Sequence, residues 1–401
     1  MPTALLFAVD GHLEPGLTRV VEADLRRQLD GLRLDGAAVG TAFEVRDARL
    51  PGHRVLVRLT ALPAPGVVVD DRTSFEFSAE ASPPAAPGPG APSVEVPPEL
   101  AQYASVVVTV PPDDAQALAR SAARIDGLLG IPKDAVIADV VSRLRGRGWL
   151  AEWSRRHYGR LIPGADDVLR STSFVLLTGD PGTGKSVLVH HLPPVAARRL
   201  NRPVLFVQLS ERLRGSGIQG RAGTDVVGVL DAIGRMAERY GLPTVVFLDE
   251  AEAVASSRGS TDGSSGAQEN VAVVDALIVG LDRVFARTDI PVVFVMATNL
   301  AGRMDPAVLR RATVYRFERP SAADRHAILV RALGDAVDMA VLEQVAAALE
   351  RPEPRLTAAD LLNQVIVRAV REAAHHDRPI DPEHLLHLAR TAVATAPVAG
   401  G

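Results

Sequence analysis

The stretch Gly179-Asp180-Pro181-Gly182-Thr183-Gly184-Lys185-Ser186 holds the residue types that bind a phosphate chain. It follows the apolar run Phe174-Val175-Leu176-Leu177 and leads into an apolar segment that begins at Val187, which is also expected to contact the nucleotide. A strand, a glycine-rich loop and a helix in this order form the G-x-x-x-x-G-K-[ST] phosphate-binding motif. The glycines let successive backbone N–H groups point at one anion, at the positive end of a helix. Lys185 is expected to reach the β- and γ-phosphates and the Ser186 hydroxyl to ligate Mg²⁺, so the predicted cofactors are ATP and Mg²⁺.

The choice of lysine within this loop is informative. The chain has 44 basic residues, and only Lys133 and Lys185 among them are lysine. A chain that uses arginine so heavily would be expected to have it here unless the site rejects a planar guanidinium. Composition therefore favours a phosphate site over a glycine-rich turn with an incidental lysine.

Two carboxylates follow a second apolar run. Val245 to Leu248 reads as a buried strand, and Asp249 and Glu250 come directly after it. Because the carboxyl ends of strands in doubly wound sheets face the ligand crevice, Asp249 is expected to hold Mg²⁺, directly or through water. Glu250 is expected to polarise the attacking water. A solvated strand end is the alternative, but this spacing after a phosphate loop favours the catalytic interpretation.

Three more side chains are candidates for catalysis. Asn299 follows the apolar run Val292 to Ala297 and could orient the attacking water or touch the γ-phosphate. Arg310 and Arg311 follow a short helix that begins near Asp305. In isolation they would be a solvated basic face. Beside the other motifs, they are better explained as arginines supplied to the γ-phosphate of a neighbouring subunit.

Composition sets the class of protein. With 401 residues, 47% apolar content and 23% charged content, the chain is long enough for two or three globular domains. The formal net charge of −4 and the lack of a strongly basic stretch make nucleic acid an unlikely partner. The sequence has no cysteine and no apolar run approaching membrane-spanning length. We therefore expect a cytoplasmic protein with no membrane partner.

The elements that must position these residues suggest four segments. Residues 1–80 read as a small α+β domain for adaptor or substrate recognition, with a strand over 4–9 and a helix from Leu17 to Leu34. Residues 81–98 form a Pro/Gly-rich linker. Residues 99–318 alternate strands and helices, which predicts an α/β nucleotide-binding subdomain with a parallel sheet flanked by helices. Residues 319–401 read as a helical lid.

The individual elements of the last two segments can also be assigned. The strands are predicted at Ser105–Val110, Phe174–Thr178, Val204–Leu209, Thr244–Leu248 and Val292–Ala297. Pro193 and Pro194 should kink or restart the helix after the phosphate loop. The lid helices are predicted at Ala322–Leu333, Ala340–Leu349, Thr357–His375 and Pro382–Ala392, with Asp338, Thr357 and Asp381 as N-caps.

This set of motifs, with a helical lid, resembles an AAA+ P-loop ATPase module over roughly residues 120–395. The resemblance implies a homo-oligomeric ring, most often a hexamer, with ATP between subunits. Within the superfamily the sequence is most similar to the pachytene-checkpoint ATPases that remodel HORMA-domain proteins, whose bacterial relatives serve anti-phage signalling. The segments Phe247 to Val254, Val273 to Asp282 and Arg311 to Ala323 carry this likeness.

The resemblance also locates a pore loop and a lid position. The family's central-pore aromatic residue falls on Ile218 and Gln219, before Gly223, and the family's lid arginine falls on Ala359. A branched aliphatic side chain such as Ile218 can still grip a client chain sterically. These positions are departures from the family pattern.

The resemblance implies an ATP-hydrolysing remodeller that acts on a protein client through a hexameric pore, with a HORMA-domain protein as the candidate client. Two alternatives remain open at the level of sequence. One is a nucleic-acid-handling AAA+ ATPase of the helicase-loader type, which the acidic net charge argues against. The other is a nucleotide-dependent scaffold that barely hydrolyses ATP.

Overall fold

The computed structural model describes residues 94–170, 174–210, 213, 222–255, 264–287, 290–350 and 354–398, together with six strands within the first 78 residues. The chain divides into two units, Met1–Ala86 and Pro87–Gly401. The first unit contains a sheet of order β3-β4-β1-β6 and a separate pair, β2 and β5. Its strands are β1 (Ala4–Val9), β2 (Arg33–Leu34), β3 (Ala42–Val45), β4 (Val55–Ala61), β5 (Val67–Val68) and β6 (Ser74–Ser78).

The helix predicted from Leu17 to Leu34 is wrong at its end. Arg33 and Leu34 are extended and pair antiparallel with Val68 and Val67. The remainder of that prediction falls on residues 17–32, which lie outside the described residues. At Arg33 and Leu34, pairing with a distant strand decides the conformation.

The second unit is built on a six-stranded sheet of order β12-β8-β11-β10-β9-β7. All pairs are parallel except β7 with β9, which is antiparallel. The strands are β7 (Ala104–Val110), β8 (Phe174–Thr178), β9 (Val204–Leu209), β10 (Thr244–Leu248), β11 (Val292–Thr298) and β12 (Ala312–Arg316). The predicted α/β fold with a parallel sheet and a helical lid is confirmed.

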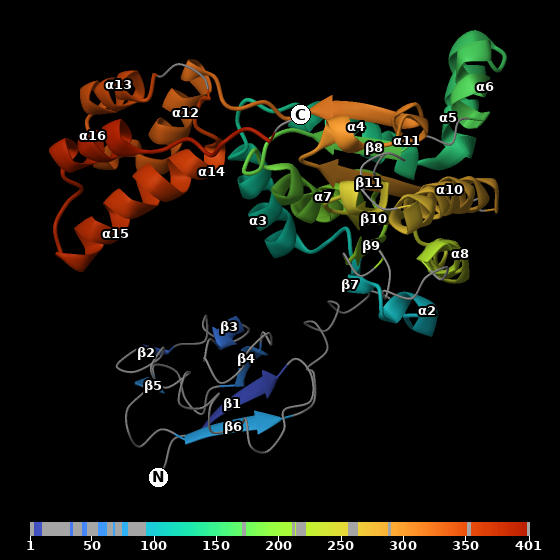
Figure 1. The fold of residues 1–401 in the computed structure, drawn as a ribbon, viewed down its shortest axis with the longest axis horizontal. Coiled ribbons are helices and arrows are strands. Elements are labelled where there is room, and N and C mark those ends of the chain that lie inside the picture. Colours follow the sequence, from blue (N-terminus) through green and yellow to red (C-terminus); the bar gives the residue numbers. More distant parts are fainter. Residues whose placement is uncertain are drawn as a thin grey trace. The chain divides into compact units, whose positions relative to one another are not determined.

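Both faces of this sheet are covered by helices (Figure 1). Val175 and Leu177 of β8 pack with α4 and α7, whereas Phe174 and Leu176 pack on the opposite face with α8 and α10. Because alternate side chains enter two different cores, every position of the strand must be apolar. The helices are α2 (Pro98–Ala101), α3 (Ala115–Asp126), α4 (Lys133–Leu144), α5 (Gly146–Tyr158), α6 (Pro163–Arg170), α7 (Lys185–Leu200), α8 (Ala222–Tyr240), α9 (Glu252–Ala255), α10 (Ser264–Arg287), η3 (Ala301–Arg303) and α11 (Pro306–Leu309).

Two features of the sheet subdomain differ from expectation. The helix after the phosphate loop, α7, contains Pro193 and Pro194 but does not restart. It buries Leu188, Leu192 and Ala196 between the sheet and neighbouring helices, and this packing holds the helix through the prolines. The edge strand β12 was not predicted. Its half-exposed residues, Ala-Thr-Val-Tyr-Arg, lack the continuous apolar run of a central strand.

The lid packs its helices around a separate core (Figure 1). Its elements are α12 (Ala322–Leu333), η4 (Gly334–Ala336), α13 (Met339–Ala348), α14 (Ala358–Asp360), η5 (Leu361–Ile366), α15 (Val367–His375) and α16 (Pro382–Thr391). The predicted N-caps Asp338, Thr357 and Asp381 are confirmed, because each side chain accepts a hydrogen bond from a backbone N–H of its own helix. The helix predicted from Thr357 to His375 contains a wide π-turn, η5.

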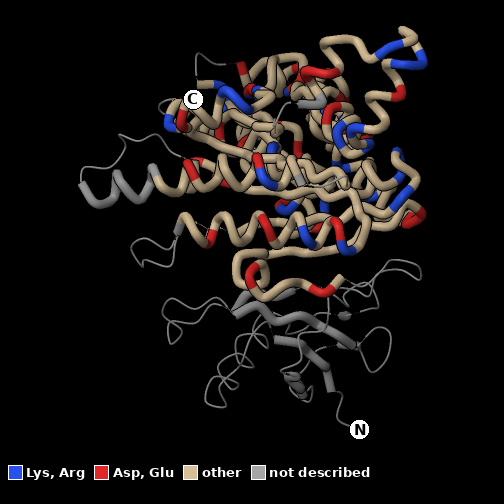
Figure 2. The backbone as a smooth tube through the Cα atoms, turned by 90° about the vertical axis from the view of Figure 1, so that its right-hand side faces the viewer, with Lys and Arg blue, Asp and Glu red and all other residues tan. Residues whose placement is uncertain are grey.

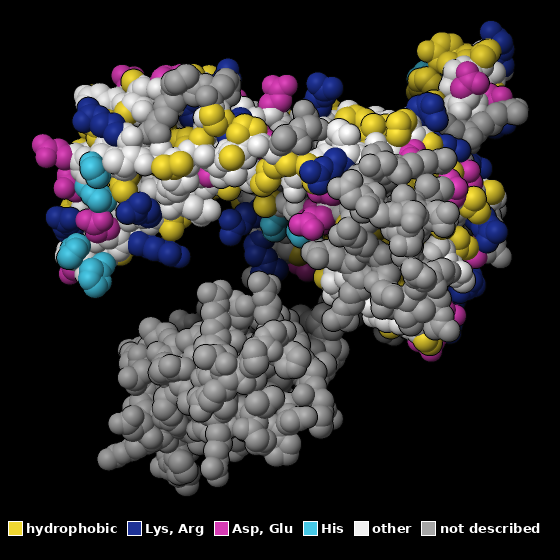
Figure 3. All heavy atoms as spheres, in the orientation of Figure 1, with side chains coloured by type: hydrophobic (Ala, Val, Ile, Leu, Met, Phe, Trp, Pro, Cys, Tyr) yellow, Lys and Arg dark blue, Asp and Glu magenta, His cyan; other side chains and the backbone are white. Residues whose placement is uncertain are grey.

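The surface of the second unit mixes charges and carries one apolar projection. Lys and Arg lie beside Asp and Glu along the described helices (Figure 2). The helices α5 and α6 carry partly exposed apolar side chains, visible in Figure 3, that include Trp149, Tyr158 and Val168. At the start of this unit, Val94 and Val96 pack against the sheet core and the Glu95 N–H donates to Tyr240 Oη at 2.8 Å. Residues 94–98, the end of the predicted linker, therefore pack with this unit.

Candidate nucleotide site

The phosphate loop joins β8 to α7 and bends tightly at its glycines. Gly179 has φ 145°, and a Cβ there would lie 2.1 Å from the carbonyl oxygen of Phe317. Gly182 has φ 81°, and a Cβ there would lie 2.8 Å from Ala359 Cβ. Since side chains are excluded by both the backbone angle and the close neighbours, these two positions require glycine. The loop curls as an anion-binding N-terminus requires.

Lys185 is buried at the first position of α7, with 5% of its surface exposed. Its Nζ donates to the carbonyl oxygens of Gly179 at 2.7 Å and Asp180 at 2.9 Å, and to Asn299 Oδ1 at 2.9 Å. Burial lowers the pKa of the Lys185 ammonium, while the carboxylates of Asp249, Asp180 and Glu252 act in the opposite direction. The fold thus brings the predicted phosphate lysine and the predicted Asn299 together from β8–α7 and β11.

The predicted metal ligands also meet. Ser186 Oγ donates to Asp249 Oδ2 at 2.6 Å, and the other carboxylate oxygen of Asp249 accepts the N–H of Glu250 at 3.0 Å. A hydroxyl beside a carboxylate is the oxygen donor set that Mg²⁺ takes, with the remaining ligands from phosphate and water. Among the described residues there is no cluster of three or more His, Cys, Asp or Glu that could hold a metal. The pair therefore fits a magnesium ion carried by a nucleotide.

Glu250 stands at the end of β10 in an unusual backbone conformation. Its φ is 51°, in the left-handed region that residues with a side chain rarely adopt. Its side chain is exposed. Strain of this kind persists where the surrounding structure fixes it, and it concentrates at functional sites. The position fits the predicted role of Glu250 as the group that polarises the attacking water.

Glu252 is a nearby carboxylate that sequence reasoning did not select. Its Oε2 is buried and has no hydrogen-bond partner among the described residues. Its charge partly opposes the lowering of the Lys185 pKa that burial causes. The signal available in the sequence was its place two residues after Glu250, which by itself does not distinguish it from other helix-start carboxylates.

Among the described residues, the Arg311 side chain contacts Asp282 and the Ala307 carbonyl oxygen and not the phosphate loop. Arg310 is exposed, and Arg311 Nη2 lies 3.7 Å from Asp282 Oδ2 of α10. Asp305 caps the short helix before them by accepting the Ala307 N–H at 2.7 Å. Their role in catalysis remains a prediction, and it requires a second subunit.

The lid reaches the phosphate loop directly. The Ala359 N–H donates to the carbonyl oxygen of Gly182 at 3.1 Å. Thr357 Oγ1 would lie 3.0 Å from a Cβ on Gly182. The position at which related ATPases have a lid arginine therefore contacts the loop here through its backbone.

The predicted pore-loop residues Ile218 and Gln219 lie outside the described residues.

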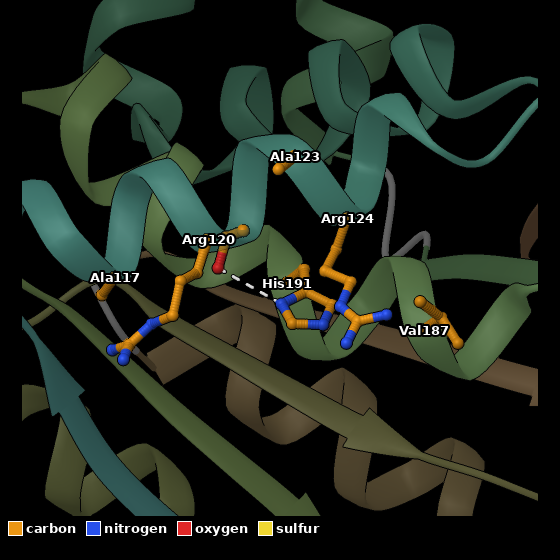
Figure 4. A pocket seen from close by; sticks show the side chains of 7 residues that line it. Ala117, Arg120, Ala123, Arg124, Val187 and His191 are labelled. Atoms are coloured by element: carbon orange, nitrogen blue, oxygen red, sulfur yellow. Dashed lines mark hydrogen bonds between the residues drawn. The ribbon is translucent and has the colours of Figure 1, made fainter. Parts of the chain in front are cut away.

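Val187, predicted to contact the nucleotide, is 42% exposed on the first turn of α7. It lines a pocket between α3 and α7 with Arg120, Arg124 and His191 (Figure 4). Burial lowers the pKa of His191, helped by the charge of Arg124, and Ser121 Oγ lies 3.2 Å from His191 Nδ1.

The mostly parallel sheet, the curled loop and the Ser186–Asp249 pair define a P-loop nucleotide-binding fold with a helical lid. Residues 175–319 match the ATPase family associated with various cellular activities (AAA), so this part of the chain is an AAA domain. CD-NTase-associated protein 6 from Escherichia coli strain MS 115-1 is 32% identical over 191 residues, which are 45% of this chain and 59% of that protein. The putative pachytene checkpoint protein 2 of Caenorhabditis elegans is 27% identical over 184 residues, 45% of this chain and 42% of that protein.

Two solved structures share the fold of the second unit. A chain of the HORMA:CdnC:Trip13 complex of E. coli MS115-1 superposes with a TM-score of 0.67 at 24% identity, covering 76% of this chain and 100% of that chain. Rhizobiales Trip13 gives a TM-score of 0.55 at 25% identity, covering 73% and 100%. The predicted resemblance to AAA ATPases of the pachytene-checkpoint group is confirmed. The chain spans 59% to 63% of the length of its E. coli relatives.

None of the described helices is long and apolar enough to cross a membrane.

Proposed function

We propose that this ATPase remodels a HORMA-domain protein, using ATP hydrolysis in a homo-hexameric ring with a central pore. The observation that carries the proposal is the meeting of Lys185, Asn299, Ser186 and Asp249 in a domain similar to CD-NTase-associated protein 6. In this proposal Asp249 and Ser186 hold Mg²⁺, Glu250 activates water, and Asn299 orients it.

The ring supplies what one subunit lacks. In this proposal Arg310 or Arg311 of one subunit reaches the γ-phosphate bound by the next, where a guanidinium stabilises the charge of the transition state. The loop around Ile218 and Gln219 grips the client in the pore, and residues 1–80 recruit it. The cellular role that fits best is bacterial anti-phage signalling.

The proposal is tested by ATP-dependent opening of a closed HORMA–peptide complex, measured as release of a fluorescent peptide. The parent protein should release peptide only with ATP and Mg²⁺. Glu250→Gln should bind ATP and the client yet release no peptide, because an amide cannot take a proton from water.

Ile218→Ala tests the pore in the same assay. It should keep basal ATPase activity while peptide release falls, and Ile218→Phe should preserve or raise release. If Ile218→Ala released peptide as fast as the parent, the threading mechanism would be wrong and a nucleotide-dependent scaffold would fit better. Stimulation of the ATPase by single-stranded DNA, and not by a HORMA protein, would favour the helicase-loader class.

A further inference from the structure

Arg319 lies between β12 and α12, in the connection from the α/β subdomain to the lid. Its side chain is 9% exposed, and its Nε donates to Asp180 Oδ2 at 2.6 Å. Its Nη1 donates to the backbone carbonyl oxygen of Arg355 in the lid. Its Nη2 is buried and has no hydrogen-bond partner among the described residues. A buried guanidinium therefore joins the phosphate loop to the lid and leaves its Nη2 nitrogen without a partner among the described residues.

The second oxygen of the same carboxylate binds the C-terminal segment. The Val398 N–H donates to Asp180 Oδ1 at 3.2 Å. This segment is also anchored on the lid, because Thr395 donates to Asp360 through its N–H at 3.0 Å and its hydroxyl at 2.7 Å. Figure 1 shows the segment running from α16 back toward the α/β subdomain. The Asp180 carboxylate thus binds both Arg319, in the connection to the lid, and Val398, in the C-terminal segment.

The backbone of Asp180 belongs to the phosphate cradle. Its carbonyl oxygen accepts hydrogen bonds from Lys185 Nζ at 2.9 Å and Thr183 Oγ1 at 2.8 Å. Lys185 has to turn toward phosphate oxygens when a nucleotide binds, so its bond to the Asp180 carbonyl must change. A change at this peptide is passed to the side chain of the same residue, which holds Arg319 and Val398.

We infer that Asp180 and Arg319 are positioning residues that couple nucleotide occupancy to the lid and the C-terminal segment. The inference rests on the proposed function, because it takes the loop to bind ATP. Neither residue takes part in bond breaking. Coupling between two sites is reciprocal, so an interaction that responds to nucleotide must also change the affinity for nucleotide.

The test measures the dissociation rate of a fluorescent ADP analogue and kcat at saturating ATP. Truncating one member of a buried hydrogen-bonded charge pair mainly changes dissociation rates. Asp180→Ala and Arg319→Ala should each raise the ADP dissociation rate about tenfold. The effect of the double variant should be smaller than the sum of the two single effects, because both single changes break the same Asp180–Arg319 bond. In Arg319→Ala, a change outside the phosphate loop, kcat should change by less than about threefold, since Arg319 does not touch the reacting atoms.

Two further variants separate positioning from folding. Arg319→Lys keeps a cation that can reach Asp180, and should recover most of the parental dissociation rate if the pair is what matters. Val398→Pro removes the N–H that donates to Asp180 and also fixes φ at this residue, whereas Val398→Ala changes the side chain and keeps the N–H. Val398→Pro should raise the dissociation rate and Val398→Ala should not.

The outcomes are distinguishable from failure of the proposed function. If Lys185→Ala bound the ADP analogue normally, the nucleotide site itself would be wrong. If Lys185→Ala lost binding while Asp180→Ala and Arg319→Ala had additive effects, only the coupling would be wrong. If Val398→Pro and Val398→Ala changed the ADP dissociation rate equally, the C-terminal segment would not take part in the coupling.

Discussion

The buried polar residues of the α/β subdomain and those of the lid have different partners. In the α/β subdomain, Lys185 bonds to Asn299, 114 residues away, and Ser186 bonds to Asp249, 63 residues away. In the lid, Thr357 and Asp360 bond to each other across three residues, and Arg325 bonds to the carbonyl of Pro320, five residues away. The longer lid pairs, Arg325 with Glu350 and Asp360 with Thr395, span only 25 and 35 residues. Local pairing satisfies helix ends. Long-range convergence of a cation, a hydroxyl and a carboxylate at strand ends instead creates a place for a ligand.

The largest expected effect comes from changing the one buried lysine of the α/β subdomain. Lys185→Ala should abolish ATP binding, because the phosphates lose their mobile cation. Lys185→Arg should fail as well, since the planar guanidinium cannot take the place of a compact ammonium among these carbonyls. Binding would be measured by titration calorimetry with ATP and Mg²⁺. Parental affinity in Lys185→Arg would show that the site does not select lysine.

The second prediction concerns catalysis by the α/β subdomain and replaces Arg311. Arg311→Ala should bind ATP but hydrolyse it on the order of 10³-fold more slowly, without loss of thermal stability. Arg310→Ala is measured alongside, because whichever of the two variants loses hydrolysis identifies the arginine that supplies the charge. Mixing Arg311→Ala with Lys185→Ala subunits should restore activity in part. No recovery in rings shown to be mixed would mean that the arginine acts within its own subunit.

The third prediction concerns the stability of the lid and replaces Arg325. It is 2% exposed and bonds to Glu350 Oε1 at 2.5 Å and to the Pro320 carbonyl oxygen at 2.9 Å. Arg325→Ala should lower the free energy of unfolding by about 2 kcal/mol, a reduced value because Glu350 remains half exposed. The exposed Arg368→Ala is the control in urea unfolding. Normal stability with lost ATPase activity would assign Arg325 to the chemistry instead.

The smallest effect concerns the lid carboxylate. Burial opposes ionisation of Asp360, but hydrogen bonds from Thr395 and Thr357 outweigh it and lower its pKa from 3.8. A lowered pKa contributes stability that is complete above the ordinary value and is lost as the pH falls through the folded-state value. The free energy of unfolding of the parent should therefore exceed that of Asp360→Asn by about 1 kcal/mol at pH 6. The difference should shrink as the pH is lowered, and urea unfolding at each pH measures it. A constant difference from pH 6 to pH 3 would contradict this.

The sequence alone determined the residues of the phosphate loop, the carboxylates at Asp249 and Glu250, and four central strands within one residue. A loop that must curl around an anion needs glycines and a lysine at fixed spacing, and a strand buried on both faces needs an unbroken apolar run. Both requirements involve only a few adjacent residues, so the pattern can be recognised in the sequence. The caps at Asp338, Thr357 and Asp381 were predictable for the same reason.

The tertiary structure decided what depends on distant neighbours. The edge strand β12 has no strong pattern of its own and forms by pairing with β8. The continuity of α7 through Pro193 and Pro194 depends on packing against the sheet. Arg319 had no distinguishing neighbours in the sequence, because its partner Asp180 is 139 residues away. Contacts between segments so far apart arise only when the chain has folded, and it is there that the phosphate loop meets the lid and the end of the chain.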